Sequence, residues 1–295
     1  AVRTDSSLGA THNAGRAKLR VPRIEPTEEP PMPTLRTMLN EPAPVIGTLV
    51  SNPLMAKLAE QAGFQALYLG GGMLGYSKVV LEANLNITEL TQAGLDIRAV
   101  TDLPLILDGA TGFGDPMHMH RTIPLAEAAG FAAIEIEDQL VPKRAHHHVG
   151  IEHMVPLELM AAKVHEAVTA RRSEDFLIVA RTNGIRSTDL DDALERAESY
   201  KAAGADLLML GPRNEVELRA IADRLEGPFQ ILVPAAGVSA LGMSIEELGE
   251  LGFKLLIDAA KPMLASFRAW KEIYDTTGPD LSSPALTADD ARRLA

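Results

Sequence analysis

From about residue 40 onward, the sequence alternates short, continuous apolar runs with longer amphipathic stretches, and this alternation restricts the possible folds most strongly. Continuous apolar runs are typical of strands buried on both faces, and helical periodicity between them predicts the helices that cover those faces. Eight such runs indicate an α/β fold of the (β/α)8 TIM-type barrel class rather than an open doubly wound sheet. The predicted strands are Val45–Val50, Ala66–Leu69, Pro104–Leu107, Ala132–Ile136, Phe176–Ala180, Leu207–Leu210, Gln230–Val233 and Lys254–Ile257, and the clearest helical stretches are Pro53–Ala62, Pro156–Arg172, Leu190–Ala203 and Glu215–Glu226.

Four helix-to-strand joints carry a glycine in a similar local sequence. Gly63, Gly130, Gly204 and Gly252 each follow the end of an expected helix and precede an apolar run. Glycine adopts the left-handed conformation that ends many helices because it has no Cβ to clash with the backbone. Any α/β protein has such joints, so the pattern predicts local geometry and carries no functional information.

Residues 1–33 differ from the rest of the chain. Positions 22 to 33 hold five prolines, apolar periodicity is weak, and the long apolar segment of a secretory signal is missing. We therefore expect a flexible N-terminal arm over residues 1–33. Residues 34–295 are expected to form the barrel catalytic domain, with helices at its C-terminal end.

Composition excludes several classes of function. Acidic residues outnumber basic ones by 40 to 28, which gives a formal charge of −12 and argues against a nucleic-acid partner. No apolar run approaches the ~18 residues of a membrane-spanning helix, so we expect no membrane partner. The lack of targeting signals favours a cytoplasmic location. The absence of cysteine excludes a disulfide scaffold, a zinc–thiolate site and a cysteine nucleophile.

Charged side chains follow the predicted strands at the end where (β/α)8 barrels carry their active sites. Asp108 comes directly after the third strand, Glu135 and Glu137 lie along the fourth, and Arg181 follows the fifth. Because side chains alternate with period two, both glutamates should point to one face, where a cation must offset their charge. The planar guanidinium of Arg181 suits a carboxylate. This set favours a divalent cation together with an anionic substrate.

Two further motifs have both a structural and a functional interpretation. The run Gly70–Gly72 could be a tight turn, or it could expose backbone amides that bind an anion. Three consecutive histidines, His146 to His148, cannot all bind one metal ion in regular geometry. That run therefore favours a solvated loop with one functional histidine over a metal site.

Four segments taken together resemble the isocitrate lyase/phosphoenolpyruvate mutase superfamily. They are Tyr68–Gly72, Leu107–Gly114, Ile136–Gln139 with Pro142–Arg144, and Ile178–Asn183. The resemblance extends from about residue 34 to residue 275, with the segments in this order and in strand-like contexts. It implies a (β/α)8 enzyme that breaks a C–C or P–C bond next to an oxyacid group, through a metal-stabilised enolate.

The resemblance also implies a metal site and a substrate site. Mg²⁺, or alternatively Mn²⁺, would be held by Asp108 and Glu137, partly through water. The partner would be a small-molecule carboxylate that chelates the ion and accepts hydrogen bonds from backbone amides. The implied substrate-binding residues are Tyr68, Gly71, Gly72 and Arg181.

The catalytic residues implied by the resemblance are Lys143, Arg144, His147 and Arg181. The first three fall in a segment, Lys143 to Ile151, that would close over the site. Many members of the superfamily are tetramers that exchange C-terminal helices. The resemblance therefore implies a homotetramer in which a helix at Pro262–Tyr274 is swapped between subunits.

The chain departs from the superfamily pattern at four positions. A second metal-binding aspartate is usual at the position of Ala110, and the lyase branch has its acid cysteine at the position of Ala145. The usual serine before the paired glycines is Gly70, and the acidic or histidine residue after strand six is Gly211. These departures predict a weaker or more hydrated metal site and a general acid other than cysteine.

Three functions remain open on this sequence. A C–C lyase or decarboxylase, similar to 2-methylisocitrate lyase-like and oxaloacetate decarboxylase-like members, ranks first, with a histidine to supply the proton. A phosphonopyruvate or phosphoenolpyruvate mutase-type P–C enzyme ranks second, because that branch usually has a Thr-Asn pair where this chain has Arg144 and Ala145. The third is a degenerate member that binds a carboxylate without turning it over.

Overall fold

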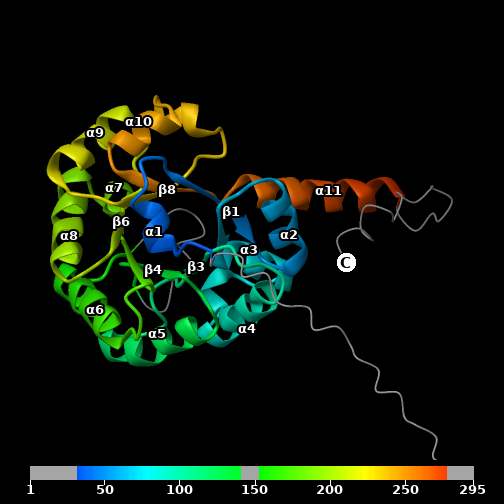
Figure 1. The fold of residues 1–295 in the computed structure, drawn as a ribbon, viewed down its shortest axis with the longest axis horizontal. Helices are drawn as coiled ribbons and strands as arrows, with labels where there is room; N and C mark the ends of the chain where they lie inside the picture. The colour runs from blue at the N-terminus through cyan, green and yellow to red at the C-terminus, as the bar shows by residue number, and fades with distance from the viewer. Residues whose placement is uncertain (1–31, 141–152, 278–295) are drawn as a thin grey trace, which may run out of the picture. The chain divides into compact units, whose positions relative to one another are not determined.

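The computed structural model describes residues 32–140 and 153–277, which contain a (β/α)8 barrel (Figure 1). Eight parallel strands are arranged in chain order, and the barrel closes where β1 pairs with β8. The predicted fold class is therefore confirmed. The strands are β1 (Val45–Val50), β2 (Ala66–Leu69), β3 (Leu105–Asp108), β4 (Ala133–Glu137), β5 (Leu177–Arg181), β6 (Leu207–Met209), β7 (Phe229–Leu232) and β8 (Phe253–Asp258).

Helices connect the strands and surround the barrel (Figure 1). Several begin where the sequence supplies a capping side chain: Asn86 and Glu89 form a capping box at the start of one helix, and Asn52 caps another. The helices are α1 (Leu35–Leu39), α2 (Pro53–Gln61), α3 (Gly71–Lys78), η1 (Glu82–Asn84), α4 (Ile87–Arg98), η2 (Pro116–His118), α5 (Met119–Ala128), α6 (Leu157–Ala170), α7 (Gly184–Ser187), α8 (Leu190–Ala202), α9 (Glu215–Arg224), η4 (Val238–Leu241), α10 (Ile245–Glu250) and α11 (Lys261–Thr277).

The local geometry of the helix-to-strand joints agrees with the sequence. Gly63, Gly130, Gly204 and Gly252 all have positive φ angles, between 81° and 104°. Each ends a helix as predicted, because the left-handed conformation is open to glycine at little cost. The predicted strands also agree with the observed ones to within one residue at each end.

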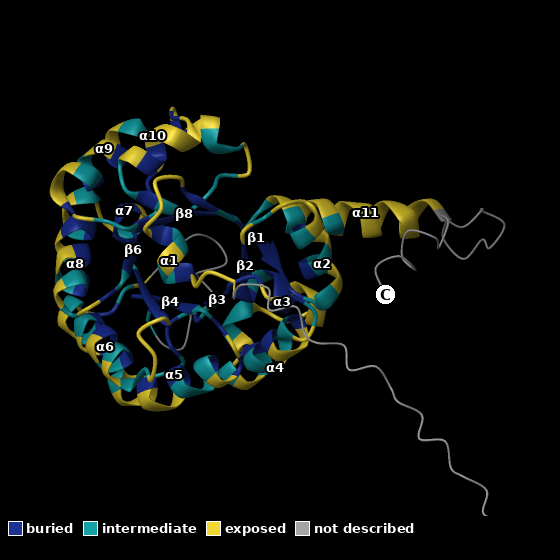
Figure 2. Cartoon of the chain, viewed as in Figure 1, coloured by how far each residue is buried: buried dark blue, intermediate teal, exposed yellow. Residues whose placement is uncertain are grey.

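The apolar core has two layers. One layer fills the space between the strands and the surrounding helices, and the other fills the barrel interior. In Figure 2 the strands are coloured as buried, and the outer sides of the helices as exposed. Helix α1 covers the amino-terminal end of the barrel, because Leu35 and Leu39 pack with the interior layer. Arg36 fixes the helix there through an ion pair with Asp206 at 2.7 Å. The amino-terminal end of the barrel is thus closed by apolar packing, and the predicted charged residues lie at the opposite, carboxyl end.

The loop after β3 is built from backbone conformations that are rare for side-chain-bearing residues. Ala110 has a φ of 47° and Phe113 a φ of 61°, and Gly112 and Gly114 between and after them are also positive. The turn brings Ala110 O into a hydrogen bond with Glu137 N at 2.8 Å. The loop is thereby tied to the end of β4, next to the residues that we expect to be functional.

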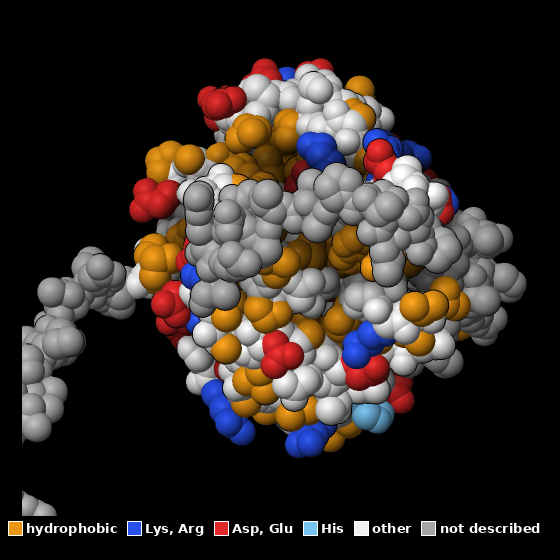
Figure 3. Space-filling view, turned by 90° about the vertical axis from the view of Figure 1, so that its right-hand side faces the viewer, with side chains coloured by type: hydrophobic (Ala, Val, Ile, Leu, Met, Phe, Trp, Pro, Cys, Tyr) orange, Lys and Arg blue, Asp and Glu red, His pale blue; other side chains and the backbone are white. Residues whose placement is uncertain are grey.

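The long C-terminal helix α11 confirms the predicted helix at Pro262–Tyr274 and extends away from the barrel (Figure 1). Nearly all of its side chains are exposed or half-buried, including Phe267 and Trp270. In Figure 3, hydrophobic side chains gather around a hollow on the face turned to the viewer, and charged side chains are scattered over the same face. Exchange of this helix between subunits remains a prediction.

Two other expectations are affected by which residues the structure describes. The predicted N-terminal arm, residues 1–33, lies outside the described residues except for Met32 and Pro33. Within the described part of the chain, none of the helices combines the length and apolar character needed to cross a membrane.

Candidate active site

The register of the barrel brings the predicted residues of strands β3, β4 and β5 together. Asp108 is level with Glu135 in the β3–β4 pair, and Glu137 is level with Arg181 in the β4–β5 pair. Side chains on adjacent parallel strands at the same level point to the same face. These four charged side chains therefore lie at the carboxyl end of the barrel, the mouth, where the sequence places them.

Glu135 is almost completely buried in this mouth, with 1% of its surface exposed. It accepts a hydrogen bond from Arg181 Nη1 at 2.9 Å and another from the Gln230 side-chain amide of β7, across the barrel. Burial raises the pKa of Glu135 to about 7, and the opposing effect of Arg181 does not cancel it. This carboxyl is thus poised to exchange a proton near neutral pH.

Arg181 joins the two glutamates. Its Nε lies 3.3 Å from Glu137 Oε2, and the same nitrogen donates to Asn183 Oδ1 at 3.3 Å. Burial lowers the pKa of the Arg181 guanidinium, but Glu137 and Glu135 outweigh burial and hold the pKa above its ordinary value. The guanidinium therefore stays charged, and two of its nitrogens face protein carboxylates.

Asp108 links the ends of β2 and β3. Its Oδ2 accepts a hydrogen bond from the Gly71 backbone amide at 3.1 Å, and its Oδ1 accepts one from the Ala110 amide at 3.0 Å. Gly71 is the first residue of α3, so the carboxylate also lies at the positive end of that helix dipole. The Gly71 amide, expected to contact substrate, thus contacts the protein's own Asp108 in this structure.

Tyr68 and Gln230 each place a buried polar atom in the same region. Among the described residues, neither the Tyr68 hydroxyl nor the Gln230 side-chain oxygen has a hydrogen-bond partner. Burial raises the pKa of Tyr68 well above its ordinary value, and Asp108 and Glu135 raise it further, so the hydroxyl keeps its proton. Leaving such atoms unsatisfied is costly, which points to a ligand or water as their partner.

Glu82, in η1, is a site residue that the sequence reasoning missed. A Cβ atom at Gly71 would lie 2.7 Å from Glu82 Cγ, so the Glu82 side chain packs directly on that glycine. Its charge is close enough to contribute to the raised pKa of Tyr68. The available signal was an acidic residue ending the apolar sequence Val79-Val80-Leu81 shortly after the glycine run.

The donor set fits a hydrated magnesium ion better than a fully protein-bound one. Within residues 32–140 and 153–277, no three or more His, Asp or Glu side chains are grouped so that they could hold a metal ion. Asp108 and Glu137 still offer the carboxylate oxygens that Mg²⁺ prefers, and Mg²⁺ commonly keeps several waters while binding one or two carboxylates. Ala110, where a second aspartate was expected, contributes only its backbone.

The predicted catalytic residues are divided by what the structure describes. Arg181 lies in the mouth as expected, beside both glutamates. Lys143, Arg144 and His147, together with the rest of the histidine run, lie outside the described residues. The described chain reaches that segment at Leu140 and resumes at His153, where Leu140 N donates to His153 O at 2.6 Å.

Comparisons with known proteins agree with this geometry. The phosphoenolpyruvate phosphomutase family model matches residues 35–277. Over 247 residues the chain is 35% identical to a 2-methylisocitrate lyase of Aeropyrum pernix, covering 83% of this chain and 79% of that protein. Over 246 residues it is 32% identical to a 2,3-dimethylmalate lyase of Eubacterium barkeri, with coverages of 81% and 83%. A solved phosphonopyruvate hydrolase, in complex with oxalate and Mg²⁺, matches with a TM-score of 0.77 at 27% identity, covering 88% of this chain and 93% of that one.

Proposed function

The chain belongs to the phosphoenolpyruvate phosphomutase family, within the isocitrate lyase/phosphoenolpyruvate mutase superfamily, and we propose that it is a Mg²⁺-dependent carbon–carbon lyase or decarboxylase. Its substrate would be a small 2-oxo or 2-hydroxy dicarboxylate or tricarboxylate. The two relatives described above, at 35% and 32% identity, are both named as lyases, which favours C–C over P–C cleavage.

The observation that carries this proposal is the excess of negative charge in the mouth. Glu135 and Glu137 pair with one guanidinium, that of Arg181, and the charge of Asp108 acts on the same group. Asp108 and Glu137 each make Glu135 harder to ionise. Buried like charges of this kind are costly unless a cation offsets them. A divalent cation and an anionic substrate that binds to it would together restore the balance.

Asp108 and Glu137 are the residues that would hold the ion. When bound, Mg²⁺ supplies Lewis-acid stabilisation for the charge that develops on the oxygens of the substrate. The protein's own residues bind and orient the rest of the substrate: the Tyr68 hydroxyl keeps its proton and can donate to it. The Gln230 side-chain oxygen, also buried in the mouth, can accept from a hydroxyl or protonated carboxyl.

Proton transfer would fall to residues of the 141–152 segment, with His147 as the preferred donor in place of the missing cysteine. Lys143 and Arg144 would contribute positive charge toward the carboxylate substrate. The high overall negative charge of the chain, −12, does not attract such a substrate, so these local cations must do so.

The P–C alternative is supported by the solved phosphonopyruvate hydrolase, whose fold this chain shares at 27% identity. A binding-only member is supported by the alanine at position 110, which removes a carboxylate from the mouth. One assay separates the three: oxaloacetate, 2-methylisocitrate, 2,3-dimethylmalate and phosphonopyruvate are tested for formation of pyruvate or phosphoenolpyruvate with and without Mg²⁺. Formation of either product from phosphonopyruvate alone would favour the second function, and oxalate binding without any turnover would favour the third.

The metal assignment has its own test. We expect Asp108→Ala to abolish both Mg²⁺ binding, measured by titration calorimetry, and activity. A matched control is Asp258→Asn, at the end of β8, where the carboxylate pairs with Lys261 instead. Unchanged Mg²⁺ affinity in Asp108→Ala would contradict the assignment of Asp108.

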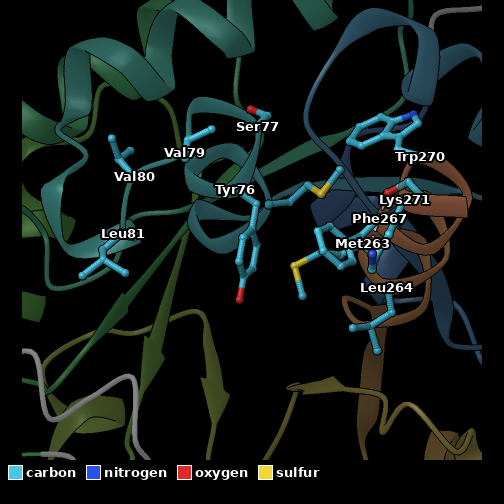
Figure 4. A pocket seen from close by; sticks show the side chains of 12 residues that line it. Tyr76, Ser77, Val79, Val80, Leu81, Met263, Leu264, Phe267, Trp270 and Lys271 are labelled. Carbon is cyan, nitrogen blue, oxygen red and sulfur yellow. Dashed lines mark hydrogen bonds between the residues drawn. The ribbon is translucent and has the colours of Figure 1, made fainter. Parts of the chain in front are cut away.

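We also propose that the chain forms a homo-oligomer through α11. The helix presents an apolar stripe of Leu264, Phe267, Trp270 and Tyr274, spaced so that all four lie along one side. Three residues of the stripe, Leu264, Phe267 and Trp270, line one side of a groove of about 880 Å³, and the exposed Val79 and its neighbours after α3 line the other (Figure 4). Exposed apolar surface of this kind marks protein interfaces.

A second copy of the same chain fits this groove because both of its walls are apolar and can be covered by an equivalent helix. Sedimentation velocity of the full chain tests the proposal. Phe267→Glu should dissociate the oligomer, and Ala269→Glu, which adds the same charge on the opposite side of α11, should not. A monomeric wild-type chain at micromolar concentration would contradict the proposal.

A further inference from the structure

Another buried carboxylate lies behind the mouth, outside the barrel interior. Asp138 directly follows β4, is 0% exposed, and points toward α8. Its Oδ1 accepts a hydrogen bond from Asn183 N at 3.0 Å. Its Oδ2 accepts one from Thr182 Oγ1 at 2.7 Å and one from Tyr200 Oη at 2.9 Å, and Arg196 Nη1 lies 3.5 Å from that oxygen. Asp138 thus connects the end of β4 with the end of β5 and with α8.

Asn183 carries this connection into the mouth. Its backbone amide is bound to Asp138, while its side chain points to the other side of the strand ends. There, Asn183 Nδ2 donates to Glu137 Oε2 at 3.0 Å, and Asn183 Oδ1 accepts from Arg181 Nε at 3.3 Å. One buried amide therefore contacts the proposed metal-binding carboxylate and the guanidinium beside it.

We infer that Asp138 is a positioning residue for the proposed reaction: by fixing the Asn183 backbone, it sets the orientation in which the Asn183 amide holds Glu137 and Arg181. Asp138 itself does not contact substrate, because its carboxylate faces α8. The inference rests on the proposed function, since it assigns a role in the arrangement of that same site.

Apart from the contact with the Thr182 hydroxyl, the network has two branches, and they predict different consequences. One branch runs through Asn183 to the mouth, and the other runs through Tyr200 and Arg196 to α8. If Asp138 only anchored α8, loss of either branch would lower stability and leave the chemistry intact. If it positions the site, loss of the Asn183 branch lowers turnover, whereas loss of the Tyr200 branch lowers stability alone.

Asp138→Asn replaces an acceptor by a donor at a position where several donors converge, so the amide cannot satisfy all of them. We expect it to lower kcat at least about tenfold, as small displacements of catalytic groups do. Asn183→Ala should lower kcat to a similar extent. The double variant should be no worse than Asn183→Ala alone, because both changes act through the same amide. Multiplicative losses in the double variant would overturn the inference.

Two control variants separate positioning from anchoring. Tyr200→Phe removes the α8 branch and keeps the Asn183 contact, so it should lower the urea midpoint and leave kcat within twofold. Asp192→Asn removes the other carboxylate bound to Arg196, 3.0 Å from its Nε, and should behave in the same way. If Asp138→Asn does not fold, Tyr200→Phe and Asn183→Ala still decide: equal loss of kcat in both would overturn the inference.

A crystal structure of Asp138→Asn provides a readout that does not depend on the reaction. We expect the Asn183 side chain to be displaced from Glu137, and an unchanged contact would overturn the inference. If the wild-type chain turns over none of the four substrates, the proposed function fails, and this structural result still decides whether Asp138 orients the mouth.

Discussion

Strands β3 to β5 and strands β6 to β8 end at the same mouth, yet the two groups carry very different side chains there. The first group ends in Asp108, Glu137 and Arg181, all held within a network of hydrogen bonds. The second group ends with Met209, the neutral Gln230 two residues before the end of β7, and Asp258, which is half-buried and pairs with Lys261.

This difference shows how the barrel confines its charge. The β4–β5 register places Arg181 beside two carboxylates of β4, Glu135 and Glu137, so that a single arginine pairs with both. The low exposure of the two glutamates makes that arrangement sensitive to any change of charge. The neutral half forms walls of the mouth. It also provides one hydrogen-bond donor, the side-chain amide of Gln230, which contacts Glu135. The following predictions test whether the charged half alone determines activity.

The largest effect is expected from Arg181→Met, which leaves Glu135 and Glu137 buried without the cation that pairs with both. Breaking a buried pair by removing one partner costs about 3–5 kcal/mol, so the free energy of unfolding should fall by that amount. Activity should fall by about 10³-fold, because charge stabilisation in the mouth is lost. Urea unfolding and initial rates measure the two effects. Wild-type stability in this variant would show that the charged half does not depend on Arg181.

Glu135→Gln should change the pH dependence of stability. The folded-state pKa of Glu135 is about 7 against an ordinary value of 4.5, so between these values the folded chain binds more protons than the unfolded chain. The contribution of Glu135 to the free energy of unfolding is therefore most favourable at low pH. It falls by about 3 kcal/mol in total as the pH rises from 4.5 to 7. Relative to wild type, the variant should gain that amount over this window. The free energies of unfolding of the variant and of wild type are measured in EDTA between pH 4.5 and 7. An equal dependence on pH in the two proteins would contradict the prediction.

Ala110→Gly should stabilise the chain by about 1 kcal/mol, because the left-handed φ of 47° is costly for alanine and not for glycine. The melting temperature should rise by about 2–4 °C. Ala99→Gly is the matched control, since Ala99 is exposed with a φ of −65° and its replacement should destabilise the chain. A lower melting temperature for Ala110→Gly would show that the loop carries no such cost.

Ala110→Asp, in contrast, should increase Mg²⁺ affinity by adding a carboxylate to the charged half.

The smallest effect is expected from Asp258→Asn in the neutral half. The carboxylate is 19% exposed and lies 3.4 Å from Lys261, a pair worth less than about 1 kcal/mol. Activity should stay within twofold of wild type. A tenfold loss of activity would contradict the division of the mouth into a charged and a neutral half.

Much of this arrangement could be predicted from the sequence because it is local. The strands, the glycine joints and the inward direction of Glu135 and Glu137 all follow from periodicity over a few residues. The resemblance to the superfamily was also carried by short motifs at the strand ends. It correctly indicated the family that the chain belongs to.

The contacts between distant residues could not be predicted in the same way. Glu82 reaches Gly71 because α3 and η1 fold back on each other, and no periodic pattern encodes that return. Gln230 contacts Glu135 across 95 positions of sequence, through the closed interior of the barrel. In the sequence, Asp138 cannot be distinguished from an ordinary outward-facing residue next to β4. Its role could be inferred only once the position of α8 was known.

By itself, the sequence determined which residues form the barrel, which end carries the charge and which family's chemistry to expect, because each of these depends on short-range patterns or motifs. Only the tertiary structure decided how that charge is balanced. The packing of the strands against one another sets which carboxylates share Arg181, which amides contact Asp108 and which buried atoms need a ligand. Electrostatic and hydrogen-bond energies depend on distances and burial, and those arise only when strands far apart in sequence meet.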